Sequence, residues 1–234
     1  MAEVVVIYGK SGAGKSRSLV NFKEDEIFLI NTIGKRLPFK TKFKYTYTTD
    51  DVDKMVELMQ RMPTKIAVID DAGFIMTNQF MREHTTPKYG ADQFKMYNII
   101  ADRFFNLVNA CKALPEGKIV YIILHEDEAD NGTIRLKTIG KLLDQKCPIE
   151  SMVTICLRCV VEAGNRHVFK TQNEGTDISK SPEGMFDATI DNDLKFVDTT
   201  IREFWGLPDS TPSPAQKQEE KKPVKVTVSD RIGG

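Results

Sequence analysis

The stretch EVVVIYGKSGAGKS, residues 3–16, decides the fold. Its first part, residues 3–8, is a run rich in β-branched side chains, which is typical of a strand buried in a parallel sheet. The second part, residues 9–16, matches the pattern G-x-x-x-x-G-K-S/T in full. A helix is expected next, over residues 15–22. The motif therefore has the strand before it and the helix after it that distinguish a phosphate-binding P-loop from a chance glycine-rich turn.

The residue types of this loop suit a nucleotide with magnesium. Glycines let the backbone turn so that its N–H groups point at phosphate oxygens, and the following helix adds its positive N-terminal end. Lys15 is expected to reach the β- and γ-phosphates, and the Ser16 hydroxyl to bind Mg²⁺. The other residues predicted to bind ATP are Gly9, Lys10, Ser11, Gly12, Ala13, Gly14 and Arg17.

Strand-like and helix-like segments alternate along the rest of the domain. Strands are expected at residues 26–30, 65–69, 119–124, 152–162 and 166–171, helices at 52–62 (capped by Asp50 or Asp51), 94–114 and 194–205, and loops at 31–49, 76–90 and 125–150. This alternation predicts an α/β fold with a mainly parallel sheet, helices on both faces and a C-terminal antiparallel hairpin. Residues 1–206 are expected to form one domain. Residues 207–234, dominated by Pro, Ser, Gln, Glu and Lys, are predicted to be a disordered tail.

Composition excludes several function classes. Lys plus Arg and Asp plus Glu both total 33, so nucleic-acid binding would need a local basic patch or an oligomer that concentrates one. The longest apolar runs are strand-sized, and the first strand begins too near Met1 for a signal peptide, so we expect no membrane partner. Four cysteines are too few for a disulfide scaffold of this length, so a reducing cytoplasm is the expected compartment.

Cys156 and Cys159 form a C-x-x-C pattern inside a predicted strand. Residues three apart in a strand point to opposite faces of the sheet, so the two thiols cannot share a metal without a bulge. We expect core cysteines rather than a zinc site.

Gly9, Asp70 and His125 each follow a predicted strand immediately. Ligands of parallel sheets bind beyond the carboxyl ends of the strands, so these residues are expected to meet in one crevice. Asp70 is the expected partner of Mg²⁺, because it is an acid at the end of a buried strand. Asp71 is the first candidate to orient or activate the attacking water. Helix capping or a solvated turn is the alternative role for both acids.

His125 and Glu126 follow the strand predicted at residues 119–124. His125 is a candidate sensor of the γ-phosphate that passes its state to the next loop, and an ordinary polar residue is the alternative. Glu126 competes with Asp71 for the role of activating water.

Two groups of basic residues are candidates for nucleic-acid contact. The first comprises Lys35, Arg36, Lys40, Lys42 and Lys44, with aromatic residues between them. This mixture suits single-stranded nucleic acid, where bases stack and phosphates pair, and it equally suits a solvated β-ribbon. The second, weaker group comprises Lys137, Lys141 and Lys146.

In this order the motifs resemble those of the RecA-like ATPases that phages carry for recombination, the Sak-type group of phage AAA-domain nucleotide-binding proteins. The landmarks are YGKSGAGKS at 8–16, GKRLPF at 34–39, VIDD at 68–71, LHE at 124–126, FKTQNEG at 169–175 and KSPEGMF at 180–186. The P-loop is common to many families, whereas the later segments, KSPEGMF above all, point to this group. The resemblance covers residues 3–206 and implies a RecA-like core without accessory domains.

The resemblance also implies partners and roles. It implies a homo-oligomer, ring or filament, with ATP between subunits. Such an assembly would act on single-stranded DNA in recombination or annealing, beside a single-strand DNA-binding protein, in the cytoplasm of a phage-infected bacterium. Lys15, Ser16 and Asp70 match the nucleotide and magnesium positions, and His125 matches the strand-end sensor position. Lys180 lies where such assemblies place a basic residue that reaches a neighbour's γ-phosphate; a surface lysine before a Ser-Pro turn is the alternative.

One departure from RecA concerns the catalytic acid. RecA carries a glutamate at the end of its second strand, but here Ile30 is followed by Asn31 and Thr32. Water activation would then fall to Asp71 or Glu126, or hydrolysis would be slow.

The sequence thus favours a DNA-stimulated ATPase and leaves two alternatives. A nucleotide or small-molecule kinase would need an arginine-rich lid, and Arg135 and Arg158 are too scattered to supply one. An ATP-gated interaction module with negligible turnover is the other alternative, and the missing glutamate is consistent with it.

Overall fold

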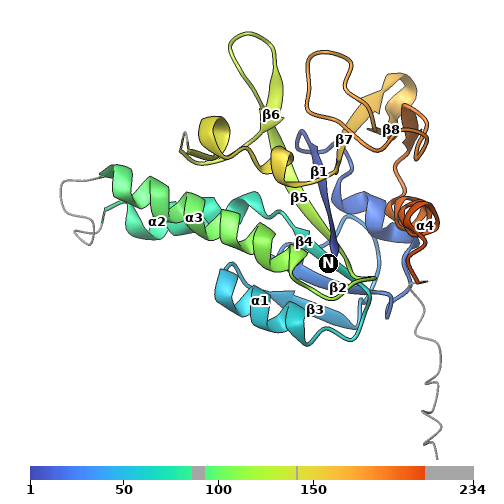
Figure 1. The fold of residues 1–234 in the computed structure, drawn as a ribbon, viewed down its shortest axis with the longest axis horizontal. Coiled ribbons are helices and arrows are strands. Elements are labelled where there is room, and N and C mark those ends of the chain that lie inside the picture. Colours follow the sequence, from blue (N-terminus) through green and yellow to red (C-terminus); the bar gives the residue numbers. More distant parts are fainter. Residues whose placement is uncertain (86–92, 141, 209–234) are drawn as a thin grey trace, which may run out of the picture.

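The structure is a computed structural model that describes residues 1–85, 93–140 and 142–208. Within these ranges nine strands form the sheet, in the order β3-β2-β4-β5-β1-β7-β8-β9, with β6 paired to β5 (Figure 1). The strands are β1 (Glu3–Gly9), β2 (Ile27–Asn31), β3 (Tyr45–Thr48), β4 (Ile66–Asp70), β5 (Ile119–Glu128), β6 (Ile134–Leu136), β7 (Ile155–Glu162), β8 (Arg166–Lys170) and β9 (Thr189–Asp191). All pairs from β3 across to β7 are parallel, whereas β7-β8, β8-β9 and β5-β6 are antiparallel. The predicted sheet, with its C-terminal hairpin, is confirmed.

Helices cover both faces of this sheet, as predicted (Figure 1). One face carries α1 (Val52–Gln60), α2 (Gly73–Glu83) and α3 (Gln93–Lys112), and the other carries η1 (Ser16–Asn21) and α4 (Leu194–Trp205). Shorter helical turns are η3 (Leu142–Lys146), η4 (Ile149–Met152) and η5 (Ala163–Asn165). The helix that follows the P-loop is a 3-10 helix.

β1 lies in the middle of the sheet, between β5 and β7. Val6 and Tyr8 belong to the core under α1, α2 and α3, whereas Val5 and Ile7 belong to the core under η1 and α4. A strand buried on both faces needs apolar side chains at successive positions, which is why residues 3–8 read as one apolar run. The P-loop therefore starts from a strand that is buried on both faces.

The ends of two helices follow from local capping. The Asp51 side chain accepts hydrogen bonds from the backbone N–H groups of residues 53 and 54, so Asp51 rather than Asp50 caps α1. Asp193 caps α4 in the same way, and Gly206, with φ 63°, ends it in the left-handed conformation. The bounds predicted for this last helix, 194–205, are confirmed.

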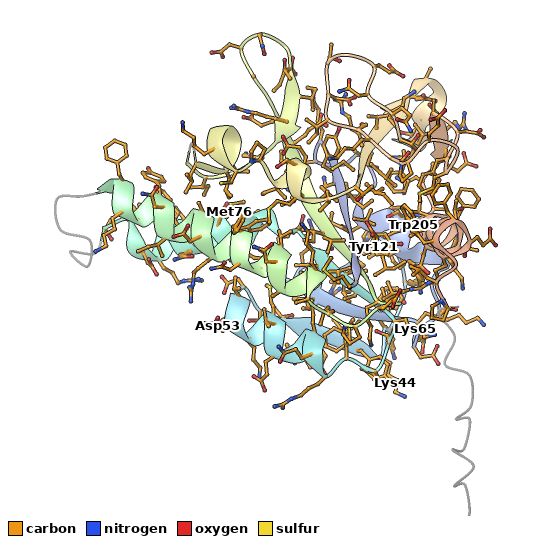
Figure 2. All side chains as sticks on the ribbon, in the orientation of Figure 1. Lys44, Asp53, Lys65, Met76, Tyr121 and Trp205 are labelled. Atoms are coloured by element: carbon orange, nitrogen blue, oxygen red, sulfur yellow. The ribbon has the colours of Figure 1, made fainter. Side chains whose placement is uncertain are left out.

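The prediction of a loop over residues 76–90 is wrong for its first part, which belongs to α2. Ile75, Met76 and Gln79 are buried there at helical spacing, and Met76 is labelled on this helix in Figure 2. The sequence pattern missed the helix because one of its buried positions carries a polar glutamine. Residues 86–90 of the predicted loop lie outside the described ranges, as do residues 209–234 of the predicted tail.

Two other predicted loops contain strands. Residues 45–48, in the segment expected to be irregular, form the edge strand β3, where Tyr47 stacks on Phe28 with ring centroids 4.8 Å apart. β5 continues through charged residues to Glu128 and pairs with β6. β3 is largely exposed and β6 has only three residues, so their sequences carry little of the hydrophobic alternation by which a strand is recognised.

Cys156 and Cys159 are buried on opposite faces of β7, in the two different cores, as predicted. In the part of the chain that the structure describes, no group of three or more His, Cys, Asp or Glu side chains could hold a metal ion. None of the described helices combines the length and hydrophobicity that a membrane span requires.

Candidate nucleotide-binding site

The P-loop lies against the C-terminal strands, which explains its glycines. A Cβ added to Gly9 would lie 2.3 Å from the backbone oxygen of Cys159 in β7. Gly14 has φ 102°, and a Cβ there would lie 2.7 Å from Asn192 Nδ2 and 2.8 Å from His167 Nδ1. Only glycine fits this close approach, so β7, β8 and the residue after β9 shape the loop from behind.

Hydrogen bonds hold the same contact. Cys159 Sγ donates to the backbone oxygen of Ala13 at 2.9 Å, and Asn192 Nδ2 lies 2.9 Å from that sulfur. His167 Nδ1 lies 2.7 Å from the Ala13 oxygen as well. These contacts all use the backbone carbonyl of Ala13 or the sulfur bound to it, so they hold the loop without using its N–H groups.

Lys15 is only 6% exposed and lies inside the loop that contains it. Its Nζ donates to the backbone oxygens of Gly9 and Lys10, both at 2.9 Å. Burial lowers the pKa of this ammonium group. The loop is thus built around a desolvated cation, an arrangement that favours an anionic ligand.

Ser16 and Asp70 form the pair predicted to hold magnesium. Ser16 Oγ donates to Asp70 Oδ1 at 2.8 Å, while Asp70 Oδ2 is buried without a hydrogen-bond partner. Burial, and next the carboxylate of Asp71, raise the pKa of Asp70 to about 6. A hydroxyl beside an unpartnered buried carboxylate oxygen is a donor set that suits a hard cation such as Mg²⁺.

Asp71 adopts an uncommon backbone conformation, with φ 55°, and is 1% exposed. Thr32 supports this turn by donating its hydroxyl to the backbone oxygens of Asp70 at 3.0 Å and Asp71 at 2.8 Å. The Asp71 carboxylate forms an ion pair with Lys35 and lies 4.0 Å from His125 Nδ1. Such backbone strain is found most often at functional sites.

His125 lies opposite Gly9 in the register of β1 and β5, so the predicted meeting of strand ends is observed. It lines the cavity above the P-loop and also a neighbouring cavity of about 480 Å³ that Lys137 lines. Burial, and next the charge on Lys15, lower the pKa of this histidine. His125 therefore connects the P-loop cavity with the segment that follows β5.

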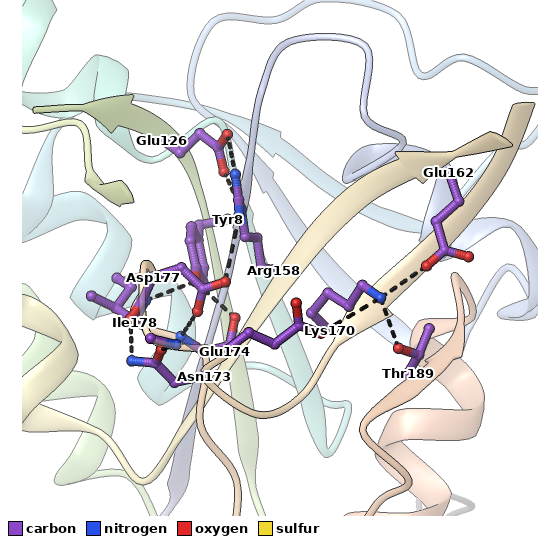
Figure 3. Close-up of polar contacts among 12 residues, drawn as sticks. Tyr8, Glu126, Arg158, Glu162, Lys170, Asn173, Glu174, Asp177, Ile178 and Thr189 are labelled. Carbon is purple, nitrogen blue, oxygen red and sulfur yellow. Dashed lines mark hydrogen bonds and ion pairs between the residues drawn. The ribbon is translucent and has the colours of Figure 1, made fainter. Parts of the chain in front are cut away.

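The structure places Glu126 away from the P-loop cavity. Its carboxylate accepts two hydrogen bonds from Arg158, at 2.8 Å and 3.0 Å, and Arg158 also reaches Asp177 at 3.4 Å (Figure 3). Adjacent residues of a strand point to opposite sides, so His125 and Glu126 cannot both face the loop. Of the two acids considered for water activation, only Asp71 lines the cavity among the described residues.

Lys180 lies outside the cavity as well. Its backbone pairs with Cys156 in β7, with hydrogen bonds of 2.8 Å and 2.9 Å. Within one chain it does not line the P-loop cavity among the described residues, so a role there would have to be toward a neighbouring subunit.

The cavity above the P-loop has a volume of about 440 Å³. Its described lining consists of Ser11, Gly12, Gly14, Lys15, Ser16, Arg17, Lys35, Arg36, Pro38, Asp71, His125 and His167. Sequence reasoning missed Lys35, Arg36 and His167 as site residues. The only signal for Lys35 was its place four residues after the second strand, and His167 carried none, because its approach depends on how the hairpin folds.

The basic segment at residues 35–44 borders a separate groove of about 750 Å³. Lys35, Arg36, Lys40 and Lys42 line it together with Phe39 and Phe43. The Phe43 ring is only 7% exposed and packs edge to face with Phe39, with centroids 6.3 Å apart, so Phe43 offers little surface on which a base could stack.

No family model matches the sequence, and no curated protein matches it. Among solved structures, the chain is similar to an ATPase from the type III secretion system of pathogenic bacteria, with a TM-score of 0.39 and 16% identity over 70% of this chain. The match covers 53% of that ATPase, so this chain spans about half of its length. A second similar structure is the genome-packaging NTPase B204 from Sulfolobus turreted icosahedral virus 2 in complex with ATP-γ-S, with a TM-score of 0.32 and 12% identity over 70% of this chain and 77% of that one. The chain thus has an α/β fold in which a P-loop follows the central strand of a sheet that is parallel from β3 to β7 and antiparallel at its C-terminal end.

Proposed function

We propose that the chain binds ATP with Mg²⁺ in the P-loop cavity and hydrolyses it. The observation that carries this proposal is the Ser16–Asp70 pair, with the free buried oxygen of Asp70, beside the desolvated ammonium of Lys15. Phosphate oxygens would take the N–H groups of the loop and the ammonium of Lys15, which now donates to loop carbonyls.

The roles of the other residues follow from their places in the cavity. Ser16 and Asp70 would hold Mg²⁺, which offsets the negative charge that develops on the phosphates. Asp71 would orient the attacking water, because it is the acid that lines the cavity. His125 would sense the γ-phosphate and transmit its presence to the β5–β6 segment, which extends from the same residue.

The biological setting we propose is the handling of single-stranded DNA during phage recombination or annealing, in the cytoplasm of an infected bacterium. The motif order of the sequence supports it. So does the extension of β5 beyond the P-loop edge into the β5–β6 hairpin (Figure 1). Lys137, just after this hairpin, lines the same cavity as His125. Assembly of several chains would allow Lys180 to reach a neighbour's ATP, and a single-strand DNA-binding protein would act on the same substrate.

One observation favours a second candidate, an ATP-gated interaction module with negligible turnover. Both acids considered for water activation are ion-paired here, Asp71 with Lys35 and Glu126 with Arg158. If neither carboxylate is released, ATP binding would change the shape of the chain without rapid hydrolysis.

The experiment that tests the proposal measures ATP hydrolysis at fixed Mg²⁺, with and without single-stranded DNA, over a range of protein concentrations. We expect stimulation by DNA and activity that rises faster than linearly with protein concentration. ATP binding with no turnover under any of these conditions would favour the second candidate. ATP hydrolysis at the same rate with and without DNA would contradict the proposed role on single-stranded DNA, while the proposed ATPase activity would stand.

A further inference from the structure

The turn after β2 delivers a lysine to the nucleotide-binding cavity. Asn31 Oδ1 accepts a hydrogen bond from the backbone N–H of Gly34 at 2.9 Å, and Asn31 Nδ2 donates to the backbone oxygen of Lys35 at 2.6 Å. Asn31 is itself paired with Asp70 in the register of β2 and β4. The amide of Asn31, at the end of β2, therefore fixes the turn that carries Lys35.

Lys35 faces Asp71 in the cavity. Its ammonium, on a side chain 49% exposed, forms an ion pair with Asp71, whose side chain is 2% exposed. After burial and other nearby charges, the charge on Lys35 is among the causes that lower the pKa of Lys15 and of His125. Lys15, Asp71 and His125 thus surround the space that Lys35 also faces.

The cavity carries more positive than negative side chains among its described lining. Lys15, Arg17, Lys35 and Arg36 face Asp71 there, with Asp70 beneath. A polyphosphate complements this excess of charge. Arg17 follows Ser16 on the loop and would serve the inner phosphates, whereas Lys35 is beside Asp71 at the end where the terminal phosphate would lie.

We propose that Lys35 is a ligand of the γ-phosphate supplied by the same chain, and that Asp71 holds it in place until a triphosphate arrives. The inference rests on the proposed function. When a γ-phosphate is bound, the Lys35 ammonium pairs with it instead of with Asp71. The Asp71 carboxylate is then free to contact water. ADP lacks this group, so the Lys35–Asp71 pair persists when ADP is bound. The same lysine thereby distinguishes ATP from ADP and frees the catalytic acid only when there is something to hydrolyse.

The segment that carries Lys35 also lines the 750 Å³ groove. A change of the Lys35 partner from Asp71 to phosphate would therefore also change the lining of this groove. Lys40 and Lys42 line this groove without lining the nucleotide-binding cavity among the described residues. They provide matched controls on the same segment.

The test measures binding rather than turnover, by titration calorimetry of the full chain with ADP and with a non-hydrolysable ATP analogue, both with Mg²⁺. In Lys35→Ala we expect the affinity for the analogue to fall by about 10-fold or more, as for the loss of a charge-assisted hydrogen bond, and the affinity for ADP to change by less than about 2-fold. Lys35→Arg should keep most of the preference for the analogue. Lys40→Ala should leave both affinities unchanged.

A double variant separates a phosphate ligand from a structural counter-ion. Lys35→Ala leaves the Asp71 carboxylate buried without its partner, which by itself could disturb the site; Lys35→Ala with Asp71→Asn removes that charge. If Lys35 is a phosphate ligand, the double variant still lacks the preference for the analogue that the Asp71→Asn single variant retains. Recovery of the preference in the double variant would show that Lys35 only neutralises Asp71, and would overturn the inference.

The native chain provides the remaining distinction. If it binds neither ADP nor the analogue, the proposed nucleotide site fails and this inference with it. If it binds both and Lys35→Ala keeps the native ratio of affinities, only the role of Lys35 fails.

Discussion

At the scale of single residues, the site depends on side chains that are buried yet charged. Lys15, Asp70 and Asp71 are all buried, and each makes only part of the hydrogen bonding that its charge requires. Buried charges are costly unless they are paired, so their retention in one place argues for a ligand that completes them.

The first prediction concerns Lys15. Replacing it by alanine should lower the affinity for ATP with Mg²⁺ by about 100-fold, because the ammonium is the buried charge closest to the loop. Equilibrium binding of a fluorescent ATP analogue provides the measurement. The control is Lys23→Ala, which replaces an exposed lysine just after η1, the helix that follows the P-loop. Thermal melting of both variants checks that they fold. Near-native affinity in Lys15→Ala would remove the P-loop assignment.

The second prediction compares two acids. Asp71→Asn should reduce turnover by about 100-fold or more while ADP still binds, as expected for loss of a group that orients or activates water. Glu126→Gln should keep turnover at a temperature where it is folded, because Glu126 pairs with Arg158 instead of lining the cavity. Steady-state rates and ADP affinities measured side by side decide between them. If Glu126→Gln is the inactive variant, the assignment of the acids is reversed.

At the scale of elements, strands on both sides of the P-loop determine where the site residues lie. β4 and β5 bring Asp71 and His125 to the cavity, while the β7–β8 hairpin supports the loop from behind. Besides its backbone pairing with β1, the hairpin is linked to β5 through Arg158, whose side chain is 18% exposed and lies between Glu126 and Asp177 (Figure 3).

The third prediction tests that link. Arg158→Ala leaves two buried carboxylates without their partner and should lower the free energy of unfolding by about 3 kcal/mol. Arg166→Ala, at the start of β8, removes exposed ion pairs with Glu162 and Asp191 and should change stability little. Urea denaturation of both variants gives the comparison. Equal, small effects would mean that the network around Arg158 is not important for stability.

The fourth prediction concerns the contact between β1 and β7. Gly9→Ala should destabilise the fold by about 1–3 kcal/mol, because its Cβ would meet the backbone of Cys159 and cannot be accommodated without moving β7. Gly73→Ala is the matched control, since the added Cβ there has no neighbour closer than 3.8 Å and Gly73 begins a helix. Urea denaturation again measures the difference, and a Gly9→Ala variant as stable as Gly73→Ala would contradict the close packing.

The same elements show what could be read from the sequence. The P-loop strand and the bounds of α4 follow from local patterns of burial and capping, so they were predictable. That Ser16 and Asp70 meet, 54 residues apart, followed instead from the P-loop motif and from the rule that parallel strands end at one edge of the sheet. The pairing of Glu126 with Arg158 joins residues 32 positions apart and depends on strand register, which no local pattern encodes. From the sequence, Lys35 is only one member of a basic run. Its position at the cavity depends on the turn that Asn31 fixes, which the sequence pattern does not reveal. α2 was missed because its buried positions include Gln79.

At the scale of the whole molecule, the open question is whether each site is completed by a second copy of the chain. Lys180 pairs through its backbone with β7 and does not line the P-loop cavity of its own chain among the described residues. Lys180→Ala should therefore preserve ATP binding and reduce hydrolysis.

The fifth prediction uses mixed assemblies to test this. Lys15→Ala is expected to bind ATP only weakly but retains Lys180, whereas Lys180→Ala retains the intact P-loop. If Lys180 acts on a neighbour, mixing the two inactive variants should restore part of the ATPase activity. A double variant that carries both substitutions on one chain, mixed with either single variant, is the control. Absence of any recovery in the mixture would remove the role of Lys180 between subunits.

The support of the P-loop by the C-terminal strands has a consequence for how the chain is made. Cys159 contacts Ala13 across 146 residues of sequence, and Asn192 contacts Gly14 across 178. The loop is synthesised well before the groups that shape it. β1 must wait for β5 and β7 to flank it, and contacts over such separations form slowly. A nascent chain should therefore bind nucleotide only when nearly the whole domain has emerged from the ribosome. A truncated chain without the C-terminal strands should not bind ATP.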